Sequence, residues 1–194
     1  MTYTTNNTSH IERLIYGKIG HVPPHLTIST WYSFPLRHMV RPYQRSLYPL
    51  SVKRLHFHNG ISAQYSKETD IGAHYFTGDG CIFVDKVSKF ACQVIKKTDG
   101  KPIRRLEDIF KHLYIDEVQD LAGWDLDLIE TLMKSRIGVT LVGDLQKSEL
   151  APPYWGNLAR AASWSTCFLI IDEPPVKIDS NLQEHVVFFC VRRG

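Results

Sequence analysis

Two short apolar runs near the middle of the chain each lead into carboxylates. The first, LYI at 113–115, precedes Asp116, and the second, VTLV at 139–142, precedes a Gly-Asp pair. Both runs are short enough to be buried strands, and the second is rich in β-branched residues. Between them, residues 124–135 carry apolar side chains at helical spacing. The pattern predicts a strand–helix–strand unit with a right-handed crossover.

Weaker patterns outside this unit predict further elements. A helix is expected to start near Thr8 or Ser9, because polar residues there suit a helix N-terminus. Arg37, Arg41 and Arg45 are spaced by four, which would set them along one helix face. Short strands are expected at 27–30, 75–76, 81–84, 168–171 and 186–191, and helices at 88–96 and 105–112.

Carboxylates gather at the ends of the two central strands. Asp116 and Glu117 follow the first strand and Asp144 follows the second. Parallel α/β sheets place their chemistry at the carboxyl ends of the strands, so these side chains are expected to cluster. An Asp-Glu pair there suits a Mg²⁺-nucleotide site, in which one carboxylate holds Mg²⁺ through water and the next orients an attacking water. Taken alone, the pair favours a solvated acidic turn.

The complete pattern is more specific than the pair. A hydrophobic strand, Asp-Glu-x-Gln-Asp at 116–120, a helix and a hydrophobic strand with Gly-Asp at 143–144 resemble motifs II and III of the UvrD/Rep-like superfamily 1 helicases. The resemblance implies ATP and Mg²⁺ as cofactors, with Asp116 as the metal ligand and Glu117 orienting the hydrolytic water. It also implies that four further side chains couple nucleotide state to DNA: Gln119, Asp120, Asp144 and Gln146. Gln146, which would also contact ATP beside Asp116 and Glu117, stands one position earlier than the motif requires.

Two segments near the N-terminus resemble the DNA-facing motifs Ia and Ib of the same family. The first is the Thr-Tyr-Thr at 2–4 with the asparagines that follow, and the second is the TWYS at 30–33. The resemblance implies that Thr4, Asn6, Thr30, Trp31 and Tyr32 face single-stranded DNA, where hydroxyls contact phosphates and rings stack on bases. An ordinary capped helix and an aromatic core cluster are the alternative interpretations.

Charge is unevenly distributed along the 194 residues. Residues 1–105 hold 15 Lys/Arg and 6 Asp/Glu, a balance of +9, whereas residues 106–194 hold 8 and 14, a balance of −6. A basic half beside an acidic nucleotide-type site fits a polyanionic partner, although a solvated basic surface gives the same counts. The four scattered cysteines and the absence of a long apolar stretch predict a cytoplasmic protein with no membrane partner.

The resemblance implies an α/β fold, a RecA-like parallel sheet with flanking helices. Residues 1–150 would form a partial RecA-like domain, with a basic insertion at about 46–105 that touches duplex DNA by analogy, and residues 151–194 a divergent tail. The sequence contains no Gly-x-x-x-x-Gly-Lys-Ser/Thr loop, so the phosphate-loop strand is expected to be missing. A tail strand is then expected to cover the bare edge of the strand at 139–142.

The leading functional interpretation is a fragment of an ATP-dependent DNA helicase of repair, recombination or phage defence. Its partners would be single-stranded DNA and either the rest of the helicase or a nuclease. A non-catalytic nucleic-acid-binding module is the main alternative. A different Mg²⁺-dependent hydrolase or nuclease, using Asp116 and Glu117, is the third. Without the phosphate loop, the chain by itself is expected not to hydrolyse ATP.

Overall fold

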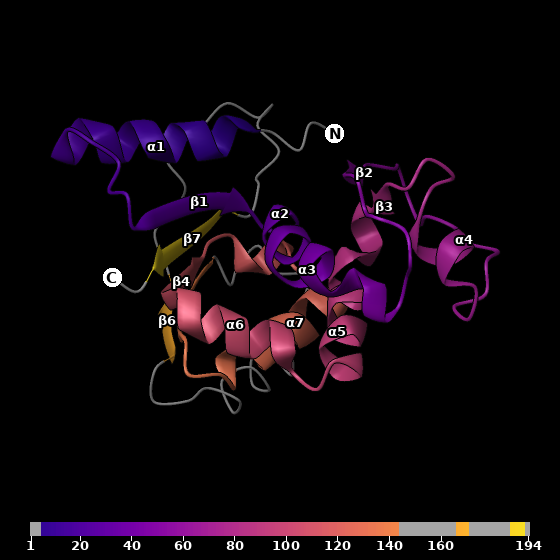
Figure 1. Ribbon diagram of the computed structural model, residues 1–194. Helices are drawn as coiled ribbons and strands as arrows, with labels where there is room; N and C mark the ends of the chain where they lie inside the picture. Colours follow the sequence, from indigo (N-terminus) through magenta and orange to yellow (C-terminus); the bar gives the residue numbers. More distant parts are fainter. Residues whose placement is uncertain (1–4, 144–165, 171–186, 193–194) are drawn as a thin grey trace. The chain divides into compact units, whose positions relative to one another are not determined.

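The computed structural model describes residues 5–143, 166–170 and 187–192, with side chains over 8–118 and 120–143 (Figure 1). Two compact units are present. The sheet unit comprises Met1–Trp31 and Glu107–Gly194, and the inserted unit comprises Tyr32–Leu106. The inserted unit therefore contains the basic segment expected at 46–105 and begins before it. Within the described residues, no helix is both long and apolar enough to cross a membrane.

The sheet unit is built on a mixed five-stranded sheet in the order β1-β7-β4-β5-β6. Its strands are β1 (Leu26–Thr30), β4 (Phe110–Ile115), β5 (Gly138–Gly143), β6 (Thr166–Ile170) and β7 (Val187–Arg192). β4, β5 and β6 run parallel, whereas β7 is antiparallel to both β4 and β1. The class is thus α/β as expected, but the sheet is mixed where a parallel sheet was expected, because β7 runs antiparallel between β1 and β4. The expectation of a covered edge is confirmed, since β6 pairs with β5.

The central strand–helix–strand unit forms where the hydrophobic pattern predicts it. Leu113 pairs with Val139 and Ile115 with Leu141, and all four side chains are buried. Helix α7 (Trp124–Met133) connects β4 to β5 and contacts β5. It buries the apolar stripe that the sequence predicts, Leu126, Ile129, Leu132 and Met133, and Leu128 is buried as well. Burying each such side chain contributes about 1.5–3 kcal/mol to folding.

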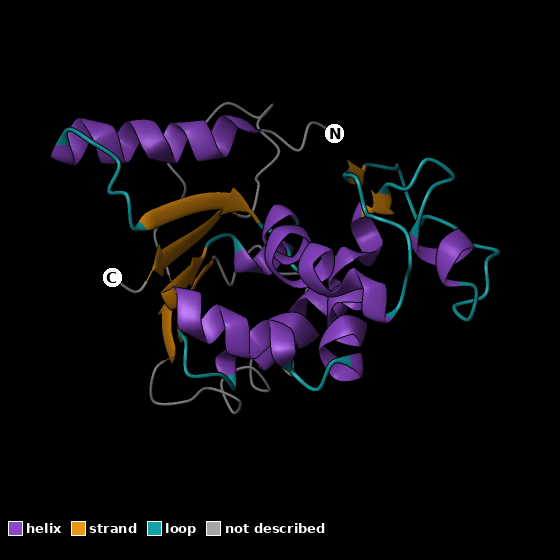
Figure 2. Cartoon of the chain, viewed as in Figure 1, coloured by secondary structure: helices purple, strands orange, loops and turns teal. Residues whose placement is uncertain are grey.

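Helix α1 (Thr5–Ile19) precedes the sheet and runs alongside β1, which it contacts (Figures 1 and 2). The helix starts at Thr5, so the expected start near Thr8 or Ser9 is wrong by about one turn. Leu14, Tyr16 and Ile19 are exposed on it. Most of the helix surface therefore lies outside the core.

The inserted unit begins with a broken helical segment. It consists of α2 (Ser33–Pro35), a π-helical turn (Leu36–Val40), α3 (Arg41–Tyr43) and a 3₁₀ turn (Gln44–Ser46). Arg37, Arg41 and Arg45, which were expected on one helix face, are all exposed, whereas Met39 and Val40 between them are buried. Arg41 also donates hydrogen bonds to the carbonyl oxygens of Val52 and Lys53.

The rest of the inserted unit packs around aromatic side chains. Its elements are β2 (Leu55–His56), α4 (Ile71–Tyr75), β3 (Ile82–Phe83), a 3₁₀ turn (Val84–Lys86), α5 (Val87–Lys97) and α6 (Lys101–Ile109), which continues into the sheet unit. β2 and β3 pair in parallel. Tyr75, Phe76 and Phe90 meet edge to face or tilted, with ring centroids 5.1–6.4 Å apart. The strand expected at 75–76 is wrong, because Tyr75 ends a helix and Phe76 forms only an isolated bridge to Ile82.

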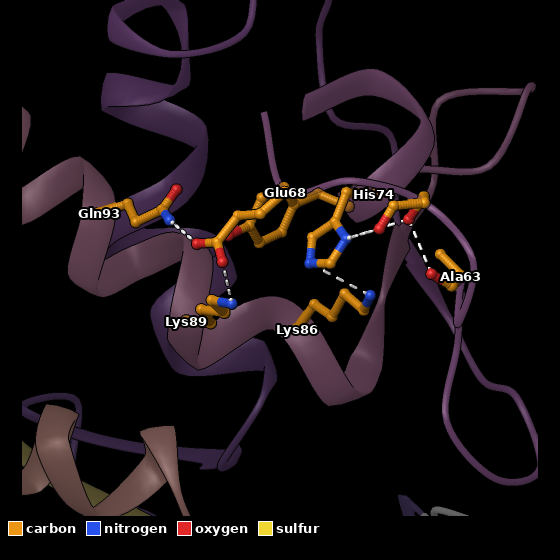
Figure 3. A network of polar contacts seen from close by, with 8 residues as sticks. Ala63, Glu68, His74, Lys86, Lys89 and Gln93 are labelled. Carbon is orange, nitrogen blue, oxygen red and sulfur yellow. Dashed lines mark hydrogen bonds and ion pairs between the residues drawn. The ribbon is translucent and has the colours of Figure 1, made fainter. Parts of the chain in front are cut away.

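A polar network ties the segment before α4 to α5 (Figure 3). Glu68 accepts hydrogen bonds from Lys89 Nζ at 2.7 Å, Gln93 Nε2 at 2.6 Å and the hydroxyl of Tyr75 at 3.3 Å. The hydrogen bond from Lys89 lowers the pKa of Glu68. His74 lies between Ser66 and Lys86, with its Nε2 3.3 Å from Lys86 Nζ. These contacts fix the loop that joins β2 to α4.

Candidate functional site

The loop after β4 holds the acidic candidates. Asp116 follows the buried Ile115, and Val118–Asp120 form a 3₁₀ turn that leads toward α7. Val118 and Leu121 are buried, so they anchor the loop on either side of its acidic residues. The Glu117 backbone N–H donates to Oδ1 of Asp116 at 3.0 Å, which orients this carboxylate.

Asp116 is half-buried, and burial raises the pKa of its carboxyl above the usual value. No cationic side chain of the described residues forms an ion pair with it. A partly desolvated carboxylate without a counter-charge suits a hard cation such as Mg²⁺. The described part of the chain contains no cluster of three or more His, Cys, Asp or Glu that could hold a metal.

Glu117 has an unusual backbone conformation. Its φ of 52° and ψ of 42° place it in the left-handed region, which a residue with a Cβ atom seldom adopts. Such a conformation costs on the order of 1–2 kcal/mol, so the surrounding fold has to impose it. Glu117 lies between the end of β4 and the 3₁₀ turn, and its left-handed conformation changes the direction of the backbone directly after Asp116.

Trp31 directly follows β1 and is only 1% exposed. Its indole Nε1 donates a hydrogen bond of 2.8 Å to Oδ1 of Asp125, in the first turn of α7. A covered ring cannot stack on a base without local opening, so this conformation favours the core interpretation of Trp31 that the sequence left open. Thr30 ends β1 and Tyr32 is half-buried.

Other candidates are placed only in part. Asp120 is exposed, and Asn6 lies in α1, although its side chain and that of Gln119 fall outside the described residues. Thr4, Asp144 and Gln146 also lie outside them. The backbone nonetheless places Gly143 at the end of β5, beside the strand that ends before Asp116. The expected clustering of Asp144 with Asp116 and Glu117 stays a prediction.

Sequence reasoning did not identify Asp125 as a partner of Trp31. The two residues are 94 positions apart, and Asp125 reads as an ordinary acidic residue in the first turn of a helix. Comparisons of the chain with protein-family models, with curated proteins and with solved structures found no match in any of the three.

Proposed function

We propose that this chain is part of a UvrD/Rep-like, ATP-dependent DNA helicase with a RecA-like sheet. One observation carries the proposal. Strands β4 and β5 are adjacent and parallel, helix α7 connects them, and Asp116 directly follows β4. Ligands of parallel α/β sheets bind beyond the carboxyl ends of the strands. Asp-Glu-x-Gln-Asp occupies one such end, and Gly143 closes the neighbouring strand.

In this proposal Asp116 and Glu117 have separate roles. Asp116, oriented by the Glu117 backbone N–H and without an ion-pair partner among the described side chains, would hold Mg²⁺. Bound Mg²⁺ neutralises charge on the phosphates of ATP. Glu117 would orient the attacking water, while Gln119, Asp120, Asp144 and Gln146 would relay the nucleotide state toward DNA. Residues 1–105, with their balance of +9, would supply the cationic surface for single-stranded DNA in the cytoplasm.

A second function is favoured by one observation. The Gly-x-x-x-x-Gly-Lys-Ser/Thr loop, which cradles the β- and γ-phosphates, does not occur in the 194 residues. A non-catalytic nucleic-acid-binding module would keep the basic surface and need no such loop. The two functions differ in whether a nucleotide changes the affinity for DNA.

The test is the fluorescence anisotropy of a labelled single-stranded oligonucleotide at low and moderate salt, with and without Mg²⁺-ATP. A helicase part binds DNA more weakly as salt rises, and if Asp116 still holds Mg²⁺-ATP without the phosphate loop, the nucleotide shifts the affinity in wild type but not in Asp116→Asn. A salt-sensitive affinity that ignores Mg²⁺-ATP in both proteins would favour the non-catalytic module. Absence of binding at low salt would contradict both functions.

A further inference from the structure

The chain passes between the sheet unit and the inserted unit at two points. Trp31 is the last residue of the sheet unit before the first crossing, and Glu107 is its first residue after the second. Each of these two residues is held by a side-chain contact within the sheet unit. The two contacts lie near opposite ends of α7, the helix that follows the Asp116 loop.

The first crossing is held by Asp125. The Trp31 indole N–H points at Asp125 Oδ1 from 2.8 Å, and the ring is almost fully covered. An indole has one donor and no acceptor, so this carboxylate satisfies its polar group. With its ring packed and its N–H held, Trp31 is anchored in the sheet unit directly after β1.

The second crossing is held by Arg136, three residues beyond the end of α7. Its backbone N–H donates to Glu107 Oε1 at 2.9 Å, and its Nη2 lies 3.1 Å from Glu107 Oε2. The Glu107 side chain is only 10% exposed. Glu107 lies 76 residues after Trp31 in the sequence. Its contact with Arg136 anchors the second crossing as the Trp31 contact anchors the first.

We infer that Asp125 is a positioning residue for single-stranded DNA, and that it acts through Trp31. The inference rests on the proposed function, because the resemblance to helicases implies that the neighbours of Trp31, Thr30 and Tyr32, face single-stranded DNA. Asp125 would not contact the DNA, because a carboxylate repels phosphates. Its hydrogen bond instead holds the segment in one conformation, so that binding does not have to order it.

Two variants at this position separate the hydrogen bond from the charge. Asp125→Asn and Asp125→Ala both remove one negative charge, but only Asn keeps an oxygen that can accept from Trp31. We expect Asp125→Ala to bind a labelled single-stranded oligonucleotide about tenfold more weakly than Asp125→Asn, since the indole N–H is left without its acceptor. Trp31→Phe should cause a similar loss, and adding Asp125→Ala to it should cause little more.

Glu107→Ala is the matched control, because it also removes one carboxylate and breaks the anchor at the other crossing. It should lower the melting temperature without weakening oligonucleotide binding.

Equal affinities of Asp125→Ala and Asp125→Asn would overturn the inference while leaving the proposed function intact. So would an equal loss in Glu107→Ala, because that loss would reflect general destabilisation. If Asp125→Ala does not fold, the comparison of Trp31→Phe with Glu107→Ala decides. If the wild-type protein does not bind the oligonucleotide, the proposed function itself is contradicted.

Discussion

The imidazole ring of His112 occupies the space that a side chain at Gly138 would need. The two residues pair across β4 and β5, and a Cβ atom on Gly138 would lie 2.9 Å from Cε1 of His112 and closer still to Nδ1. The ring is held there because its Nε2 lies 2.8 Å from Oγ1 of Thr140 and because it packs on Tyr114. The start of β5 therefore depends on a glycine.

Gly138→Ala should destabilise the protein by about 1–3 kcal/mol, the usual effect of overpacking a filled site. Urea unfolding followed by circular dichroism measures the change. Gly17→Ala in α1 is the control, because a Cβ atom there meets nothing within 4 Å. The control should stabilise the helix by about 0.5–1 kcal/mol. Equal midpoints for Gly138→Ala and wild type would show that the ring can move aside.

Stability should fall as the pH is lowered through the range in which His112 titrates. Burial lowers the pKa of His112 below its ordinary 6.5, so the unfolded chain takes up this proton at a higher pH than the folded chain. The contribution is complete above 6.5 and decreases as the pH falls from 6.5 toward the folded pKa. Urea midpoints of wild type and His112→Gln between about pH 7.5 and about pH 5.5 isolate this group. A constant difference between the two proteins over that range would contradict the prediction.

Asp116→Asn should raise the melting temperature at neutral pH. Burial raises the pKa of Asp116, which means that its charged form is less stable in the fold than in the unfolded chain. Asparagine removes that charge and keeps an oxygen for the Glu117 N–H. The gain should shrink as the pH falls through the raised pKa, because wild-type Asp116 then becomes neutral as well. A lower melting temperature for the variant at pH 7 would show that the charge has a stabilising partner.

Glu117→Gly should be more stable than Glu117→Ala by about 1 kcal/mol, because only glycine adopts the left-handed conformation without a Cβ clash. Both variants remove the same side chain, so its lost contacts cancel in the comparison. Thermal unfolding of the two proteins measures the difference. If alanine is the more stable variant, the left-handed conformation at this position is not imposed by the fold.

The isolated chain should not hydrolyse ATP at a useful rate. Phosphoryl transfer depends on holding the β- and γ-phosphates, and the sequence contains no phosphate loop for that purpose. Phosphate release with Mg²⁺-ATP and single-stranded DNA measures the rate, with Glu117→Gln as control. Release that DNA stimulates and the control abolishes would reveal a phosphate site elsewhere in the chain.

The sequence alone determined the central strand–helix–strand unit and the place of Asp116 at its edge. Apolar spacing predicted the buried strand ends and the stripe of α7 within a few residues, because burial of one face is encoded locally. The tail strands β6 and β7 were also predicted from their apolar runs.

Only the tertiary structure decided which of these elements meet. The insertion of β7 between β1 and β4 depends on pairing that no local pattern specifies. The same holds for the contact of Trp31 with Asp125, 94 residues away, which covers a ring that the sequence left as either a core residue or a stacking platform. The left-handed Glu117 is likewise imposed by its surroundings, since the intrinsic preference of glutamate opposes it. Local periodicity states which face of an element is buried, whereas packing between distant segments decides what it is buried against.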